Sequence, residues 1–80
     1  MKAVRVQYFA ILREQRGLAE ESVLTGAATP AALYAELSAR HGFTLPPARV
    51  RAALNDEFSP EAAILNDGDR VAFIPPVAGG

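Results

Sequence analysis

Hydrophobic and polar residues alternate near the start of the chain, where Val4, Val6 and Tyr8 occupy every second position. This period of two is typical of a strand that buries one face. Residues 21–25 are partly β-branched and predict a second strand, antiparallel to the first if the connection is hairpin-like. Residues 50–54 alternate in the same way and predict a third strand.

Turn sequences organise the second half of the chain. The Asn-Asp pair at 55–56 turns the chain before Phe58, and residues 59–61 can begin a short helical turn. The Asn-Asp-Gly-Asp sequence at 66–69 predicts a tight turn into the last strand, whose alternation buries Phe73. Turn formation fully explains the two aspartates in this sequence, so they predict no metal site.

Two segments are predicted to be helical. Residues 10–16 favour helix and end at Gly17, a natural C-terminal cap. In the second segment Thr29 can cap exposed amides, and Pro30 suits the first helical position. This helix ends at His41, the only histidine, which we interpret as a helix-end residue and not as a catalytic base.

Two prolines determine where the last strand stops. Pro75 and Pro76 have no N–H and a fixed φ, so the ladder cannot continue and the chain is biased to polyproline II. We therefore predict one domain over residues 1–74 and an extended tail over residues 75–80. A six-residue tail reaches about 20 Å at full stretch.

Composition narrows the class of protein. The chain has 80 residues, a net charge of −1 and 50% hydrophobic residues, as expected for one small packed domain. A net charge this close to zero does not favour binding to nucleic acid or to an anionic membrane. No apolar run approaches the length of a membrane span, and the first residues contain no signal-peptide pattern, so we expect a cytoplasmic protein.

The chain contains no cysteine, which excludes disulfides, thiolate nucleophiles and cysteine-ligated metals. The last two residues, Gly79 and Gly80, lack a Cβ and can thread where other residues would collide. The distinctive chemical group there is the α-carboxylate of Gly80. Any sulfur that the protein carries must be attached to a group other than a side-chain thiol, and this carboxylate is the obvious place.

The segment 65–80, from Leu-Asn-Asp-Gly-Asp to Pro-Pro-Val-Ala-Gly-Gly, closely resembles the small, sulfur-carrying subunits of molybdopterin synthase. The resemblance extends to residues 6–14, 29–30 and 50–56 and so covers almost the whole chain. It implies an α+β fold of the β-grasp, ubiquitin-like type. Such a fold has a mixed sheet of about four to five strands packed against one main helix, followed by a flexible Gly-Gly tail.

The resemblance also implies a mechanism. An E1-like adenylating enzyme uses ATP to convert the Gly80 carboxylate to an acyl-adenylate, and a sulfur donor protein then yields a thiocarboxylate. The tail inserts into the synthase large subunit, in a heterotetramer, and sulfur passes to cyclic pyranopterin monophosphate during molybdenum cofactor biosynthesis. The chain is expected to bind no cofactor, because it has no phosphate-binding loop, and to be no enzyme alone.

Candidate functional residues follow from the resemblance and the pattern together. Gly80 is the predicted thiocarboxylate carrier. The residues predicted to thread into the partner are Gly79, Ala78, Val77, Pro76 and Pro75. The residues predicted to bind partners are Phe9, Arg13, Phe73 and Ile74. Phe9 lies off the buried face of the first strand, so it either faces outward or packs under the second helix. Ala78 departs from the family, where a small polar residue is common.

Two other functions share the same terminal chemistry. One is a related sulfur carrier for thiamine, cysteine or transfer-RNA thiolation. The other is a ubiquitin-like modifier that conjugates to protein lysines. The full Phe-Ile-Pro-Pro-Val-Ala-Gly-Gly ending and the chain length favour the molybdopterin synthase subunit.

Overall fold

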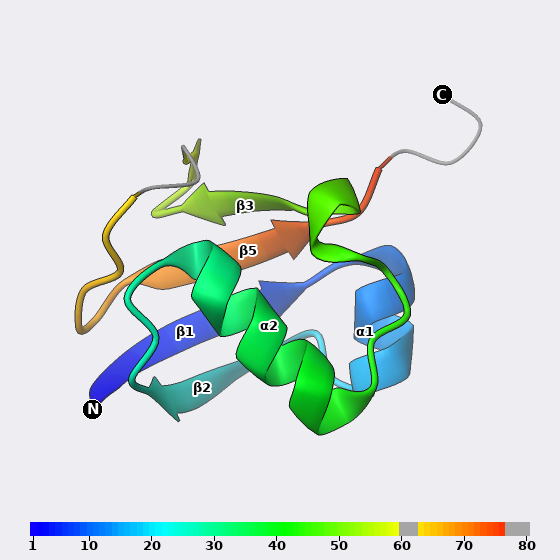
Figure 1. Ribbon diagram of the computed structural model, residues 1–80, viewed down its shortest axis with the longest axis horizontal. Coiled ribbons are helices and arrows are strands. Elements are labelled where there is room, and N and C mark those ends of the chain that lie inside the picture. The colour runs from blue at the N-terminus through cyan, green and yellow to red at the C-terminus, as the bar shows by residue number, and fades with distance from the viewer. Residues whose placement is uncertain (60–62, 77–80) are drawn as a thin grey trace.

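The last strand in the sequence is the central strand of the sheet (Figure 1). β5 (Arg70–Ile74) lies between β1 (Lys2–Tyr8), to which it is parallel, and β3 (Arg51–Leu54), to which it is antiparallel. β2 (Glu20–Thr25) pairs antiparallel with β1 at one edge, and β4 (Glu57–Phe58) pairs with β3 at the other. The strand order is therefore β2-β1-β5-β3-β4, which makes the sheet mixed.

This computed structural model describes residues 1–59 and 63–76. The helical turn predicted at 59–61 therefore lies mostly outside the described residues. All of the other predicted strands and both predicted helices are confirmed within one or two residues at their ends.

Both helices begin and end where the sequence predicts. α1 (Ala10–Arg16) ends at Gly17, whose φ of 80° is the left-handed conformation that favours glycine. α2 (Pro30–His41) begins after Thr29, whose Oγ1 accepts a hydrogen bond of 3.1 Å from the N–H of Ala32. A short 3-10 turn, η1 (Pro47–Arg49), lies between α2 and β3.

The hydrophobic core lies between α2 and one face of the sheet, and Figure 1 shows α2 crossing that face. The alternation predicted for β1 and β5 is observed, because Val6 and Val71 are fully buried. Leu33 and Leu37 of α2 are buried as well, which places the helix stripe against these strands. The aromatic ring of Tyr34 packs edge-on to that of Phe73 at 5.3 Å.

The turn before β5 uses both of its aspartates as hydrogen-bond acceptors. Asp67 accepts from the N–H of Ala3 at 2.7 Å, and Asp69 accepts from the N–H of Asn66 at 2.7 Å and the amide of Asn55 at 3.0 Å. Gly68 supplies the left-handed residue, with φ 87°. The interpretation of these aspartates as turn residues is confirmed.

Candidate functional site

The chain leaves the sheet at the end of its central strand. β5 ends at Ile74, which is in register with Arg51 of β3. Pro75 is buried and Pro76 is exposed, so the first proline packs against the domain and the second projects from it. The remaining residues of the predicted tail, Val77, Ala78, Gly79 and Gly80, lie outside the described residues, and their threading role stays a prediction.

An apolar surface lies beside this exit, on the face of the sheet opposite α2. The side chain of Phe58 is 60% exposed, and the guanidinium carbon of Arg51 lies 4.2 Å from the centre of its ring. Ile74, half-buried, is the register partner of Arg51. We call Arg51, Phe58 and Ile74 the exit surface. Aromatic residues and arginine are enriched in protein–protein interfaces.

The exit surface borders a recess of about 480 Å³ at the base of the tail. Its wall is formed by the exit surface together with Ala48, Arg49, Pro75 and Pro76. Neither Arg49 nor Arg51 forms an ion pair with a carboxylate among residues 1–59 and 63–76. The recess therefore combines apolar walls with two cationic side chains, next to the point where the chain leaves the fold.

The predicted partner-binding residues differ in how far the fold exposes them. Phe9 is 45% exposed at the start of α1, which confirms the outward orientation and excludes packing under α2. Arg13 is exposed on α1. Phe73 is only 1% exposed, so the prediction that its side chain binds a partner is wrong: β5 turns it into the core, where it packs against Tyr34.

Sequence reasoning missed Phe58 and Arg51 as surface residues. Phe58 belongs to the two-residue edge strand β4, opposite Ala53 of β3. The sequence predicts the turn at 55–56, and continuing the alternation across this turn places Phe58 opposite Ala53, on the outer face of the sheet. The stacking of Arg51 depends on this pairing between strands, which the pattern along one strand does not reveal.

A hydrogen-bonded cluster fixes the junction that carries Phe9. The hydroxyl of Tyr8 donates to the carboxylate of Glu21 at 2.7 Å. Arg16 donates to the same carboxylate through Nε at 2.7 Å and Nη2 at 2.8 Å. Burial, followed by the bond to Glu21, raises the pKa of Tyr8 well above its ordinary value. The hydrogen bonds from Arg16 lower the pKa of Glu21 despite its burial. The cluster joins β1, α1 and β2 without offering a proton donor near neutral pH.

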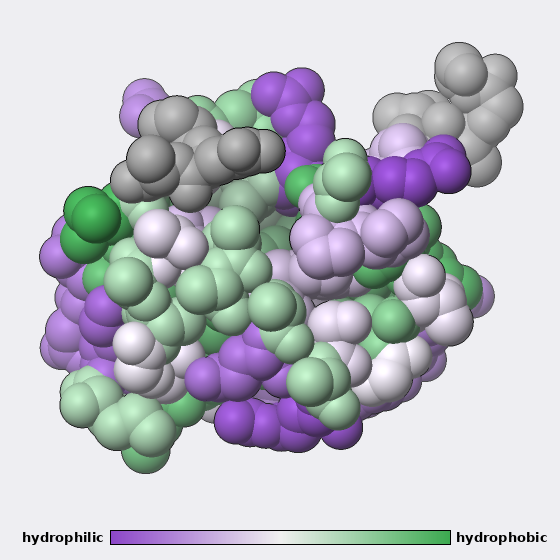
Figure 2. Space-filling view, viewed as in Figure 1, coloured by the Kyte–Doolittle hydropathy of each residue, from purple (hydrophilic) through white to green (hydrophobic). Residues whose placement is uncertain are grey.

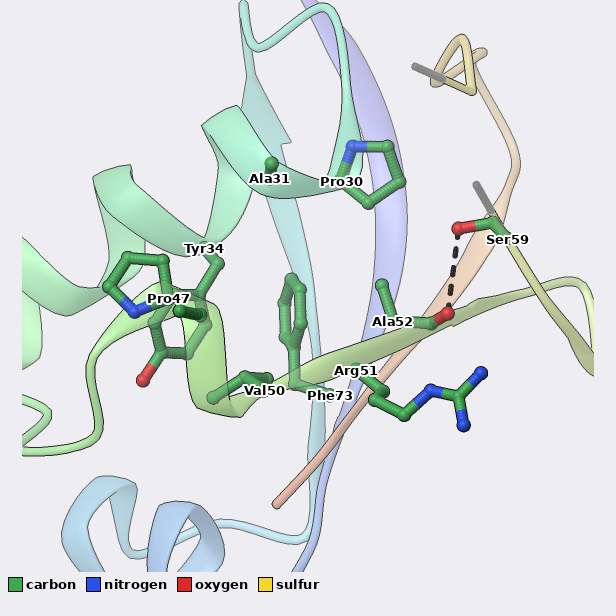
Figure 3. A pocket seen from close by; sticks show the side chains of 10 residues that line it. Pro30, Ala31, Tyr34, Pro47, Val50, Arg51, Ala52, Ser59 and Phe73 are labelled. Carbon is green, nitrogen blue, oxygen red and sulfur yellow. Dashed lines mark hydrogen bonds between the residues drawn. The ribbon is translucent and has the colours of Figure 1, made fainter. Parts of the chain in front are cut away.

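A second hollow lies on the other side of β3, between α2 and η1 (Figure 3). It measures about 450 Å³, and Figure 3 shows the rings of Pro30, Tyr34 and Phe73 around it. The hydroxyl of Tyr34 donates to the carbonyl of Leu45 at 2.7 Å, and that of Ser59 donates to the carbonyl of Ala52 at 3.4 Å. These polar groups are already engaged, so the hollow provides apolar volume without acid–base chemistry.

The rest of the described surface offers little further chemistry. Figure 2 shows mixed hydrophobic and hydrophilic side chains on the face that carries α2. Within residues 1–59 and 63–76, no three acidic or histidine side chains are grouped so that they could hold a metal ion. Over the same residues, neither helix is long and apolar enough to cross a membrane. The described part of the chain is thus a scaffold with an exit surface, and the predicted chemistry belongs to the tail.

Together, the mixed sheet with a helix across one face and the exit at the end of its central strand define a β-grasp, ubiquitin-like protein, as the sequence predicts. The chain belongs to the ThiS family, whose sequence pattern matches residues 6–80.

Individual relatives agree with this assignment. The chain is 35% identical over 80 residues to the molybdopterin synthase sulfur carrier subunit of Escherichia coli K12, with 96% of this chain and 99% of the relative covered. Its fold is similar to that of molybdopterin converting factor subunit 1 from Pyrococcus furiosus, with a TM-score of 0.77, 31% identity and coverage of 96% and 100% of the two chains. It is also similar to a chain in the complex of subunits 1 and 2 of the Helicobacter pylori molybdopterin-converting factor, with a TM-score of 0.67, 28% identity and coverage of 98% and 99%.

Proposed function

We propose that this chain is the sulfur-carrier subunit of a molybdopterin synthase and that the carboxyl group of Gly80 carries the sulfur. Membership of the ThiS family and full-length similarity to a molybdopterin synthase sulfur carrier subunit support the proposal. The observation that carries it is the combination of this family with a Gly-Gly sequence placed just after the central strand of the sheet.

A free carboxylate is a poor electrophile, so it must be activated before sulfur can be attached to it. The Gly80 carboxylate attacks the α-phosphorus of ATP, and pyrophosphate leaves, so the acyl carbon gains AMP as a leaving group. A sulfur donor protein then supplies a sulfur nucleophile, the C–S bond forms and AMP departs. If the donor carries the sulfur as a persulfide, the first product is an acyl disulfide. A thiol of the donor attacks its S–S bond, which leaves a disulfide on the donor and a soft, nucleophilic thiocarboxylate on Gly80. This route needs no cysteine in the carrier, and the chain has none.

Partners supply the catalytic groups in this proposal. An E1-like adenylating enzyme binds ATP, and the synthase large subunit holds cyclic pyranopterin monophosphate, to which the thiocarboxylate gives its sulfur. The chain then acts as a donating subunit and not as an enzyme alone. A cytoplasmic location is part of the proposal, because ATP for the adenylation is available there. A solved relative from H. pylori is in a complex of subunits 1 and 2, which supports a large-subunit partner; the heterotetramer is part of the proposal.

The exit surface and Phe9 are the proposed docking face for the large subunit. Phe9 and Phe58 are large apolar side chains that are 45% and 60% exposed, which is typical of a surface that a partner covers. The exit surface adjoins Pro75 and Pro76 in the recess at the base of the tail. A partner bound there lies within reach of a tail of six residues, about 20 Å when stretched.

Reconstitution tests the proposed function. The chain is activated with an adenylating enzyme, ATP and a sulfur donor, mixed with a candidate large subunit, and assayed for conversion of the pterin precursor to the dithiolene product. We expect conversion that requires every component. Thiocarboxylate formation without any conversion, in the presence of a large subunit shown to be active with its own carrier, would assign the chain to another thiolation route. ATP-dependent linkage to protein lysines would instead identify a modifier.

A further inference from the structure

Lys2 is the only lysine in the 80-residue sequence, and the fold holds its amino group. The residue is half-buried at the start of β1. Its Nζ donates one hydrogen bond of 2.8 Å to the carbonyl of Ala27 and another of 2.8 Å to the carbonyl of Leu65. One side chain therefore bridges the loop before α2 and the loop before β5.

The two acceptor loops are themselves joined. The N–H of Leu65 donates to the carbonyl of Ala28 at 2.9 Å, next to the carbonyl that Lys2 engages. The N–H of Gly68 donates to the carbonyl of Ala3 at 2.8 Å, which ties the second loop to β1. These bonds join the two acceptor loops to each other and to β1, which limits how far their carbonyls can follow the ammonium group toward solvent.

A free lysine amine on a carrier protein can react with the activated terminus of another copy or of its own chain. The ammonium group first loses one proton to solvent, and the lone pair of the resulting amine attacks the carbonyl carbon of an acyl-adenylate. A C–N bond forms, AMP leaves, and the nitrogen loses a second proton and keeps one as the amide N–H. The product is an isopeptide that traps the carrier terminus permanently. This concern rests on the proposed function, because only an activated carboxyl group can react in this way.

We propose that the fold withholds Lys2 from acyl transfer, so that the chain can donate its activated terminus but cannot receive one through a side chain. For attack, Nζ must lose a proton and break both of its bonds to carbonyl oxygens. Hydrogen bonds that a charged group donates to fixed acceptors are among the stronger ones in proteins. The open, reactive form of Lys2 is therefore a minor state.

The position of Lys2 also limits attack within one molecule. β1 and β5 are parallel, and Tyr8 pairs with Phe73, so Lys2 lies at the end of the sheet opposite the tail exit. Figure 1 shows the start of β1 and the exit from β5 at opposite ends of the sheet. Six residues of strand span about 20 Å, which equals the full reach of the tail and leaves no slack to orient the acyl group. The relevant acceptor is thus Lys2 of a second copy.

The acetylation rate of each lysine tests directly whether the fold protects Lys2 from reaction. The intact chain and its Arg40→Lys variant are treated briefly with an acetylating N-hydroxysuccinimide ester, and each lysine is quantified by peptide mass. Arg40 is the exposed comparison site, because its side chain is 53% exposed at the end of α2, its ion pair with Glu36 is a long surface contact of 3.8 Å, and the variant keeps the charge. We expect Lys2 to react about tenfold more slowly than the introduced lysine in the folded protein. In a denaturing concentration of urea, the two rates should become equal.

Self-conjugation provides the functional arm. Each protein is incubated with the adenylating enzyme and ATP without a sulfur donor, and covalent dimers are mapped by mass. We expect dimers joined at the introduced lysine but not at Lys2. Equal acetylation of both lysines in the folded state, or dimers joined at Lys2, would overturn the proposal. Absence of pyrophosphate release would count against the proposed function alone, because the acetylation result needs no activation.

Discussion

Arg51 and Phe58 are linked across the edge of the sheet, with the guanidinium carbon of Arg51 4.2 Å from the centre of the Phe58 ring. The two residues belong to β3 and β4, which pair through Ala53 and Leu54. A cation held over an aromatic face adds about 0.5–1 kcal/mol at an exposed site. This contact holds a 60% exposed ring in one orientation beside the tail exit, where a partner can use it.

Replacing Phe58 tests the exit surface as a docking face. Phe58→Ala removes an exposed aromatic side chain. We therefore expect the affinity of this variant for the large subunit to be about 10- to 100-fold lower than that of the wild type. The matched control is Leu24→Ala, because Leu24 is 65% exposed on β2 at the opposite edge of the sheet. Titration calorimetry with both variants measures the difference. Equal affinities for the two variants would remove the exit surface from the interface.

Replacing Phe73 tests its assignment to the core. Phe73→Leu loses ring contacts with Tyr34 and leaves a partial cavity, so we expect the free energy of unfolding to fall by about 1–2 kcal/mol. Ile74→Val, one residue along the same strand but half-buried, should cost less than about 1 kcal/mol. Urea unfolding followed by circular dichroism gives both values. If Phe73→Leu kept the wild-type free energy of unfolding but bound the large subunit more weakly, the assignment of Phe73 to the core would be wrong and its predicted role in partner binding would stand.

The cluster of Tyr8, Arg16 and Glu21 predicts how stability depends on pH. The folded-state pKa of Glu21 is lowered, chiefly by its hydrogen bonds from Arg16, so its contribution is complete above the unfolded value of about 4.3 and is lost as pH falls through the folded pKa. The folded-state pKa of Tyr8 is raised, chiefly by burial. Its contribution is therefore complete below about pH 10 and declines as pH rises toward the folded pKa.

Variants separate these two ends of the pH profile. Glu21→Gln should flatten the acid limb of a plot of unfolding free energy against pH, relative to the wild type. Tyr8→Phe should flatten the alkaline limb and leave the acid limb largely in place. Glu20→Gln is the comparison for the acid limb. The hydrogen bond from Arg5 lowers the pKa of Glu20 as well, but this pair lies on the exposed surface, where solvent weakens its contribution to stability. If Glu20→Gln flattened the acid limb as much as Glu21→Gln, the half-buried cluster would not control acid stability.

Local signals predicted most of the fold. Thr29 and Gly17 determine helix ends through caps that act within a few residues, and the alternation of β1 and β5 reflects one buried face. The surface beside the tail was harder to predict, because it is assembled from strands that are distant in sequence. Phe58 and Ile74 meet only through the pairings of β3 with β4 and β5. The two hydrogen bonds of the Lys2 ammonium group could likewise not be predicted from the sequence, since their acceptors are 25 and 63 residues away along the chain.

The site of sulfur attachment is the central claim, and intact-mass and peptide analysis test it most directly. The chain is incubated with the adenylating enzyme, ATP and a sulfur donor, alongside a variant that lacks Gly80. We expect the wild-type mass to rise by one exchange of oxygen for sulfur, with the added sulfur on the peptide that ends at Gly80, and no such change in the variant. Sulfur on any internal residue, or equal labelling of the variant, would contradict the account.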